Sequence, residues 1–307
     1  MKVLSLFDGM ACGMIAMRLA GVEIESYDAY EIDKYAIKTA QHNFPMIKEH
    51  GDVFDADFTH YDGVEFLIGG SPCTYWSIGQ TKNRETVASG MGWELFSQYV
   101  RALHEAKPKY FIYENINSMS KAIRASIDET FGFEAVLINS ALVSAQSRQR
   151  LYWVGKRKPD GTYSKVNVEQ PEDRGILLRD ILETGIAWQE KSFCITATEY
   201  KGSNPQLTLT KHRRTMVAEH IEHKSDKKYP VYEVRDGLIT IKGKQYPIKL
   251  QDGYYIVRKL TVRECMRLQT VPEWYEFPVS DSQAYKMLGN GWTVDVIAHI
   301  LKGLKEA

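Results

Sequence analysis

Cysteine is scarce in this sequence and never occurs as a Cys-x-x-Cys pair. The four cysteines are scattered over 307 residues as Cys12, Cys73, Cys194 and Cys265. This spacing argues against a disulfide framework and a structural zinc site, and it fits reduced thiols in a cytoplasm. The closest histidine pair, His220 and His223, has no further ligand nearby and fits a solvated helix face. We therefore expect no metal site.

Long apolar runs are also absent. No stretch approaches the roughly 20 residues that cross a membrane, and the start Met1-Lys2-Val3-Leu4 leads into a strand pattern without a signal-peptide cleavage region. Internal repeats and low-complexity segments are missing as well. With 44% hydrophobic and 25% charged residues, the chain has the composition of a globular protein of two domains. We expect a cytoplasmic protein with no membrane partner.

The sequence has no net charge, but its charges are unevenly distributed. Residues 201–249 hold 11 Lys and Arg against 5 Asp and Glu, a local excess of +6, so the rest of the chain carries −6. The basic residues include Lys211, Arg213, Arg214, Lys224, Lys227 and Lys228. Such a division is expected when one region meets phosphates and another performs chemistry. A solvated charged surface is the alternative, and it is the commoner meaning of such runs.

Strand and helix patterns alternate through the first half of the sequence. Apolar and β-branched runs predict strands over 3–7, 25–31, 65–68, 109–113, 135–139 and 151–154, with a short extended segment ending at 51–53. Helical periodicity predicts helices ending at 18 and spanning 34–43 and 94–106. Strands separated by helices indicate βαβ units. We therefore predict an α/β fold with a doubly wound, mostly parallel sheet.

This alternation stops at Pro159. Up to about residue 255 the sequence shows loops, lone glycines and short β-like runs at 238–241 and 254–257. Helical patterns return at 261–268, 281–288 and 293–304. We predict a first domain over 1–158, an inserted small, irregular, β-containing domain over 159–257, and a C-terminal return to the first domain over 258–307.

Cys73 is the most informative residue of the sequence. It ends the run Gly69-Gly70-Ser71-Pro72-Cys73, directly after the apolar stretch 66–68. This pattern predicts a buried strand that closes in a tight turn, with Pro72 restricting the backbone just before the thiol. Open α/β sheets bind ligands at the carboxyl ends of their strands, so Cys73 is a candidate nucleophile. The alternative is a small buried hydrophobe.

The turn after the first predicted strand is a candidate cofactor loop. It reads Phe7-Asp8-Gly9-Met10-Ala11-Cys12-Gly13, and Glu31 ends the second strand 18 residues later. Glycine lets backbone amides approach a nucleotide-like ligand, and a carboxylate there can accept ribose hydroxyls. The spacing is not Gly-x-Gly-x-x-Gly, and S-adenosylmethionine fits it at least as well as NAD. A structural turn with a surface glutamate is the alternative.

Further motifs follow in a fixed order, and together they resemble the cytosine-C5 DNA methyltransferase family over nearly the whole chain. After the loop 7–13 and the run 69–73 come Glu114-Asn115, the Gln-x-Arg-x-Arg run 146–150, the segment 258–269 and the closing motif 288–294. Three stretches depart from the common bacterial pattern: Asp8 to Cys12 in the loop, Thr74-Tyr75-Trp76-Ser77, and Gly291-Trp292-Thr293-Val294. These variants are similar to the animal de novo subgroup. No accessory domain is present, which favours a stand-alone bacterial or phage-type enzyme.

The resemblance implies catalytic roles for four residues. Cys73 would add to C6 of a flipped-out cytosine, Glu114 would supply a proton at N3, and Arg150 would hold O2. Arg148 would contact a phosphate or the surroundings of the nucleophile. The loop over 74–92, with Gly79, Gly90 and Gly92 as candidate hinges, would close over the base.

The resemblance also implies S-adenosylmethionine as cofactor, leaving as S-adenosylhomocysteine. The expected cofactor-binding residues are Phe7, Asp8, Gly9, Met10, Ala11, Cys12, Gly13, Glu31, Ile32, Asp52, Val53, Pro72, Asn290, Gly291 and Trp292. The expected partner is double-stranded DNA, a cognate restriction enzyme is allowed as a second partner, and the protein is expected to be a monomer. Residues 159–257 would recognise the target, and the expected DNA-binding residues are Gln146, Asn204, Gln206, Arg213 and Arg214.

Three other functions remain as alternatives. An RNA cytosine-C5 methyltransferase would use the same scaffold, although the insert of about a hundred residues argues against its compact branch. A catalytically silent DNA-binding regulator would have no need of Cys73 beside Glu114. A nicotinamide-dependent oxidoreductase would require a complete dinucleotide fingerprint, which is missing.

Overall fold

The computed structural model describes residues 1–79, 82–202, 204–223 and 229–306, so the basic residues Lys224, Lys227 and Lys228 lie outside the described residues. The chain divides into two compact units. Unit 1 comprises Met1–Asn139, Gln149–Pro171 and Val294–Ala307, and unit 2 comprises Ser140–Arg148 and Glu172–Thr293. Residues 258–293 thus belong to unit 2, and the division of functions between the predicted domains stays a prediction.

Within the described residues, unit 1 is built on an eight-stranded sheet with the order β3-β2-β1-β4-β5-β7-β6, and β8 pairs with β7. The strands are β1 (Lys2–Leu6), β2 (Ser26–Tyr30), β3 (Lys48–Glu49), β4 (Phe66–Gly69), β5 (Tyr110–Ile116), β6 (Val136–Asn139), β7 (Gln149–Arg157) and β8 (Tyr163–Lys165). Strands β1 to β5 are parallel, whereas β7 runs antiparallel to its neighbours. The predicted α/β fold with a mostly parallel sheet is confirmed.

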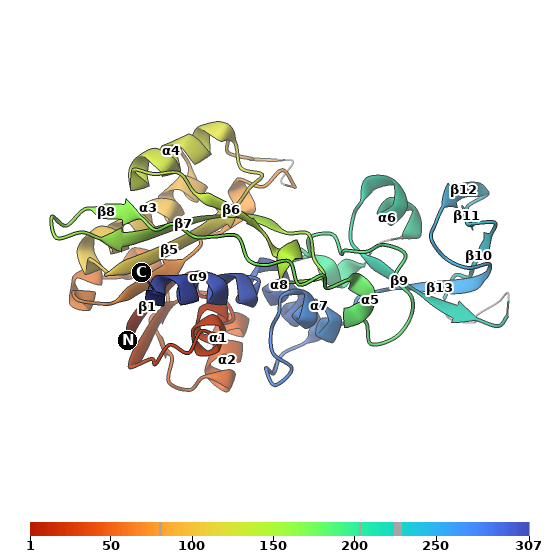
Figure 1. Cartoon of the computed structure of the whole chain (residues 1–307), viewed down its shortest axis with the longest axis horizontal. Coiled ribbons are helices and arrows are strands. Elements are labelled where there is room, and N and C mark those ends of the chain that lie inside the picture. Colours follow the sequence, from red (N-terminus) through yellow and green to blue (C-terminus); the bar gives the residue numbers. More distant parts are fainter. Residues whose placement is uncertain (80–81, 203, 224–228, 307) are drawn as a thin grey trace. The chain divides into compact units, whose positions relative to one another are not determined.

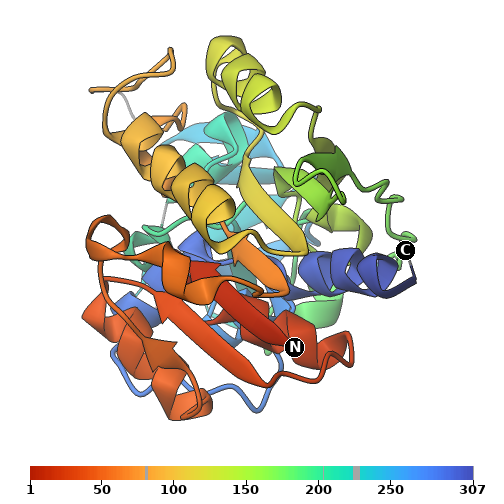
Figure 2. The same ribbon diagram turned by 90° about the vertical axis from the view of Figure 1, so that its left-hand side faces the viewer.

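Helices cover both faces of this sheet (Figures 1 and 2). They are α1 (Cys12–Leu19), α2 (Lys34–Asn43), α3 (Met91–Ala106), α4 (Lys121–Phe131) and α9 (Val294–Glu306). Helix α1 packs against α9, and α3 and α4 lie on the opposite face. A Cβ atom at Gly13 would lie 2.4 Å from Cδ1 of Ile68, so glycine at this position allows α1 to approach the sheet.

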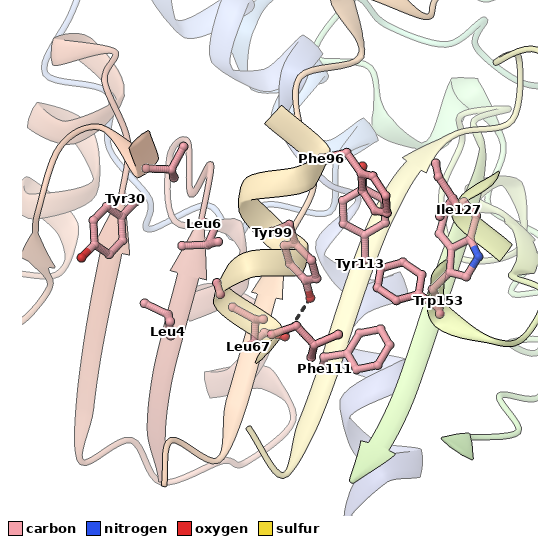
Figure 3. Packing of buried hydrophobic residues seen from close by; sticks show 14 of the residues in the cluster. Leu4, Leu6, Tyr30, Leu67, Phe96, Tyr99, Phe111, Tyr113, Ile127 and Trp153 are labelled. Carbon is pink, nitrogen blue, oxygen red and sulfur yellow. Dashed lines mark hydrogen bonds between the residues drawn. The ribbon is translucent and has the colours of Figure 1, made fainter. Parts of the chain in front are cut away.

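The core beneath α3 and α4 is formed by alternate residues of the central strands, as the period of a strand requires. Leu4 and Leu6 of β1, Leu67 of β4 and Phe111 of β5 point into it (Figure 3). Tyr99 of α3 is fully buried among them, and its hydroxyl donates to the backbone oxygens of Leu67 at 3.2 Å and Ile112 at 2.9 Å. Helix α3 is therefore fixed to β4 and β5.

The carboxyl ends of the parallel strands meet at one edge of the sheet. Leu6 pairs with Tyr30 and with Gly69, and Gly69 pairs with Tyr113. Strand β7 runs the other way, so its first residues lie at the same edge, where Arg150 pairs with Ile116. This edge is where open α/β sheets bind ligands, and the segments after β1, β2, β4 and β5 all begin there.

Unit 2 contains an antiparallel sheet with the order β12-β11-β10-β13-β9. Its strands are β9 (Met216–Ile221), β10 (Tyr232–Arg235), β11 (Leu238–Ile241), β12 (Lys244–Pro247) and β13 (Gly253–Lys259). Its helices are α5 (Leu178–Ile181), α6 (Pro205–Lys211), α7 (Val262–Leu268) and α8 (Asp281–Asn290). Buried Trp188, Val234, Ile239 and Tyr255 give this sheet a core of its own.

One prediction in unit 2 is wrong. His220, expected on a helix face, lies on strand β9 opposite Tyr255 of β13. The two rings pack edge to face with 5.3 Å between centroids, because pairing with β13 overrides the local sequence signal. Among the described residues, no helix is both long and apolar enough to span a membrane.

Candidate active site

Cys73 begins a short 3-10 helix, Cys73–Tyr75, which three residues separate from the end of β4. Its carbonyl oxygen accepts hydrogen bonds from the backbone N–H groups of Trp76 and Ser77, both at 3.0 Å. The Cys73 side chain is partly exposed, whereas a cysteine that serves only as packing is usually buried. Cys73 thus packs against the core of unit 1 without being fully enclosed in it.

The turn before Cys73 is fixed to strand β5. Nδ2 of Asn115 donates to the carbonyl oxygen of Ser71 at 3.1 Å, and the hydroxyl oxygens of Ser71 and Tyr113 lie 2.7 Å apart. All three side chains are buried. These bonds couple the position of the thiol to the strand that carries Glu114.

Glu114 and Arg150 form an ion pair across β5 and β7, with 3.0 Å between Oε1 and Nε. Their side chains are only 12% and 14% exposed, so most of the pair is shielded from water. Arg150 also donates from Nη1 to the carbonyl oxygen of Gln149 at 2.9 Å. The structure thus brings Cys73, Glu114 and Arg150 to the same edge of the sheet.

The loop after β1 has a strained backbone. Phe7 and Ala11 have left-handed φ angles of 58° and 60°, which residues other than glycine adopt rarely. The side chains of Met10, Ala11 and Cys12 are buried, so these residues can meet a ligand only through their backbone. Strain of this kind is concentrated at binding sites.

Glu31 supports this loop from the end of β2. Its Oε2 accepts a hydrogen bond from the backbone N–H of Gly9 at 2.9 Å, and its Oε1 accepts from Ile32 and Asp33, both at 2.8 Å. A carboxylate offers about four acceptor positions, so Glu31 can accept a further bond from a ligand. Ile32 is 73% exposed and presents an apolar surface beside this carboxylate.

Two further carboxyl groups surround the loop. Burial raises the pKa of Asp8 to about 6, although hydrogen bonds from Ser5 and Tyr27 lower it. Burial also raises the pKa of Glu49 to about 8, helped by the negative charges of Asp8 and Glu31. Among the described residues, Oδ2 of Asp8 and both carboxylate oxygens of Glu49 are buried without a hydrogen-bond partner. No motif in the sequence marks Glu49, so its place beside the loop was not predictable from the sequence.

The predicted extended segment ending at 51–53 is shorter than expected. Strand β3 ends at Glu49, and Val53 begins a 3-10 helix, Val53–Asp55. Asp52 caps that helix by accepting from the N–H of Phe54 at 3.0 Å, and Val53 is buried.

Gln146 and Arg148 of the run 146–150 lie in unit 2, and their side chains form hydrogen bonds within it. The Gln146 side chain is completely buried, accepts from the N–H of Ile195 at 2.8 Å and donates to the carbonyl oxygen of Leu268 at 3.1 Å. The Arg148 guanidinium donates to the carbonyl oxygens of Ile195, Gly289 and Gly291 at 3.1, 3.2 and 2.8 Å. Arg148 therefore fixes the segment that carries Gly291 and Trp292.

The residues of α6 and its surroundings that are expected to bind DNA differ in how many hydrogen bonds their side chains form within unit 2. Asn204 caps α6 by accepting from the N–H of Leu207 at 2.8 Å, and Gln206 donates to the Tyr246 hydroxyl at 2.8 Å. Arg214 donates to Oγ1 of Thr198 at 2.9 Å and to the carbonyl oxygen of Gly202. Arg213 is exposed beside it.

The described residues include no group of three or more His, Cys, Asp or Glu arranged to hold a metal ion. That the protein needs no metal stays a prediction from the sequence.

Comparison with known proteins gives a match over the whole length. The family model of the C-5 cytosine-specific DNA methylases matches residues 1–306. The type II methyltransferase M1.ScrFI of Lactococcus lactis subsp. cremoris is 27% identical over 325 residues, which covers 99% of this chain and 78% of the relative. M.FnuDI of Fusobacterium nucleatum, also a type II methyltransferase, is 27% identical over 335 residues and covers 100% and 94%.

Solved structures show the same fold. The crystal structure of the S. pombe Dnmt2 methyltransferase matches with a TM-score of 0.63 and 16% identity, over 99% of this chain and 98% of that one. At this identity the likeness concerns the fold alone.

Proposed function

This chain belongs to the family of C-5 cytosine-specific DNA methylases, and on that premise we propose that it transfers a methyl group from S-adenosylmethionine to C5 of cytosine in double-stranded DNA. The observation that carries the proposal is the grouping of the partly exposed Cys73 thiol with the Glu114–Arg150 pair at one edge of the sheet. A thiol beside an acid and a hydrogen-bond donor suits covalent activation of a ring that is itself a poor nucleophile.

The chemistry follows from what each side chain can do. The Cys73 thiolate adds to C6 of cytosine, and the electrons displaced onto the ring are taken up as Glu114 gives a proton to N3. Arg150 donates to O2 of the same base, and C5 becomes nucleophilic. S-adenosylmethionine supplies the methyl group to C5 and leaves as the neutral thioether. Loss of the C5 proton to a base, departure of the Cys73 sulfur as thiolate and return of the N3 proton to Glu114 then restore the aromatic ring and both side chains.

The loop after β1 fits this cofactor better than a dinucleotide. Glu31 is held by three backbone N–H groups and can still accept ribose hydroxyls, and the exposed Ile32 side chain can lie against the adenine. Asp8, Glu31 and Glu49 interact electrostatically around the loop. With a pKa of about 8, Glu49 is mostly protonated at neutral pH, and the carboxylates of the group that are ionised repel the pyrophosphate of NAD and attract the sulfonium and ammonium groups of S-adenosylmethionine.

A base stacked in a duplex is out of reach of these side chains, so the target cytosine must be flipped out at a cost of a few kcal/mol. The basic residues of unit 2 would offset that cost by pairing with phosphates. We further propose that Arg148 positions the segment with Gly291 and Trp292 and does not itself contact DNA. On this proposal the enzyme acts in the cytoplasm as a monomer.

Methyl transfer to purified polymers tests the proposal. The protein with radiolabelled S-adenosylmethionine should label duplex DNA, and bisulfite sequencing should place 5-methylcytosine in one short motif. Labelling of RNA and not of DNA would select the RNA cytosine methyltransferase, and label in neither would reject both functions. The Cys73→Ser protein, which keeps the fold but lacks a thiolate, is the matched control.

A further inference from the structure

Trp76 lies three positions after Cys73, and its large side chain is completely buried in the core of unit 1. The indole has one N–H donor, and a buried donor without an acceptor is costly. Here Nε1 of Trp76 donates to Oε2 of Glu85 at 3.0 Å. The acceptor lies nine residues further along the same segment.

The Glu85 carboxylate has a second partner at the start of α3. Its two oxygens lie 3.1 and 3.2 Å from the backbone nitrogen of Gly92, whose N–H donates to them. The first N–H groups of a helix have no partner within the helix and carry partial positive charge. A single carboxylate therefore joins Trp76 to the helix that Tyr99 fixes to β4 and β5.

The two glycines of this region serve that arrangement. A Cβ atom at Gly92 would lie 2.5 Å from Nε1 of Trp76 and 2.6 Å from Oε2 of Glu85. A Cβ atom at Gly90, where φ is 80°, would lie 2.5 Å from Oε1 of Glu85. Both positions thus allow the carboxylate to approach closely, and the hinge role expected from the sequence stays a prediction.

The same contacts reach Cys73 through the backbone. The N–H of Trp76 closes the turn on the carbonyl oxygen of Cys73 at 3.0 Å, and the N–H of Glu85 donates to the carbonyl oxygen of Tyr75 at 2.8 Å. Nε of Arg84 donates to the carbonyl oxygen of Trp76 at 3.2 Å. The backbone on both sides of the segment 77–83 is therefore tied down next to the nucleophile.

We propose that Glu85 is a positioning residue, which holds Trp76 and through it the turn that aims the Cys73 thiol at the target base. This inference rests on the proposed function, in which Cys73 attacks the ring. A misplacement of about 1 Å in such a nucleophile can cost about a hundredfold in rate, although binding is unaffected. Glu85 therefore acts on the rate of attack and not on the affinity for DNA or cofactor.

The test compares Glu85→Ala, Glu85→Gln and Glu94→Ala in the full-length protein. Glu94 is an exposed acid in the first turn of α3, so its removal takes away the same charge near the same helix end without touching Trp76. Two quantities are measured: the single-turnover rate of covalent adduct formation with duplex DNA that carries 5-fluorocytosine, and the dissociation constant for the same DNA.

We expect Glu85→Ala to slow adduct formation by about 10- to 100-fold with a dissociation constant within about twofold of the wild type. Glu85→Gln should recover most of the rate, since its amide oxygen can still accept from the indole, and Glu94→Ala should react normally. A wild-type rate in Glu85→Ala, or an equal loss in Glu94→Ala, would overturn the inference.

Hydrogen exchange supplies a readout that needs no reaction. In Glu85→Ala the amides of Trp76 and Ser77, which donate to Cys73, should exchange faster than in the wild type, while those of α4 stay protected. Unchanged exchange at these amides would reject the positioning role, whether or not the wild type forms the covalent adduct. If the wild-type protein forms no adduct, that result by itself would reject the proposed function.

Discussion

Glu114 and Arg150 are diagonal neighbours on antiparallel strands β5 and β7, with 3.0 Å between Oε1 and Nε. The two residues are 36 positions apart in the sequence. They meet because β7 reverses direction beside β5, so that the start of one strand lies next to the end of the other. On the proposed mechanism, the strand pairing thereby presents the carboxyl of Glu114 and the guanidinium of Arg150 together to a single ring.

Replacing Glu114 by Gln should separate catalysis from binding. The amide keeps the shape of the side chain but cannot give a proton to N3, so the single-turnover rate of methyl transfer should fall by about 10²- to 10⁴-fold. DNA affinity, measured by fluorescence anisotropy, should stay near the wild-type value. A Glu114→Gln rate within threefold of the wild type would show that this carboxyl is not the acid.

Removing Glu31 should weaken cofactor binding. Glu31→Ala loses the proposed ribose contact and the support of the Gly9 backbone, so the affinity for S-adenosylmethionine should fall by about 1–3 kcal/mol in calorimetry. Glu25→Ala is the control. The Glu25 side chain is 66% exposed, and its ion pair at the surface is a long one, with 3.9 Å between Oε1 and Nζ of Lys2. Equal affinities in Glu31→Ala and the wild type would contradict the assignment.

The buried carboxyl of Glu49 should make the protein less stable at high pH. Its pKa rises from 4.5 to about 8 on folding, so the folded state favours the protonated form. This contribution to stability is complete below about pH 4.5 and is lost as the pH rises through about 8. Urea denaturation at several pH values should show the loss in the wild type and a smaller loss in Glu49→Gln. Identical pH profiles of the two proteins would contradict the shift.

Arg213 and Arg214 should behave differently although they are neighbours. Arg213 is exposed, so Arg213→Ala should leave the melting temperature unchanged, weaken specific DNA binding by about 1–3 kcal/mol and relax the methylated motif at one position. Arg214→Ala should lower the melting temperature, because its bonds to Thr198 and Gly202 are lost. If Arg213→Ala binds all DNA sequences more weakly by the same factor, and its affinity depends less steeply on salt, Arg213 contacts a phosphate instead.

Local sequence signals were enough for much of unit 1. The helix predicted over about 34–43 is present as α2, where Asp33 caps its start and Pro45 follows its end. Helix α4 was missed although its signals are present: Ser120 caps it, and Ile123, Ile127 and Phe131 repeat at a spacing of four on its buried face. The prediction of His220 on a helix failed because strand pairing at a distance decided the structure there.

The candidate site was predictable only where a motif names the residue. Cys73, Glu114 and Arg150 stand in motifs, and the sheet brings their strand ends to one edge. Glu49 and Glu85 belong to no motif. Glu49 is distinguished by its burial near Asp8 and Glu31, and Glu85 by its hydrogen bond from Trp76, and only the fold brings these groups together. Gln146 shows the opposite limit: a motif specifies the residue type, but only the structure shows that its side chain is buried within unit 2.

Trapping of the covalent intermediate tests the central claim most directly. Duplex DNA with 5-fluorocytosine at the target position, incubated with the protein and S-adenosylmethionine, should yield a complex that survives denaturation, because fluorine at C5 cannot leave as a proton. Peptide mapping by mass spectrometry should place the DNA on Cys73, and Cys73→Ser should give no complex. A protein that methylates ordinary DNA yet forms no adduct, or an adduct on Cys12, Cys194 or Cys265, would contradict the account.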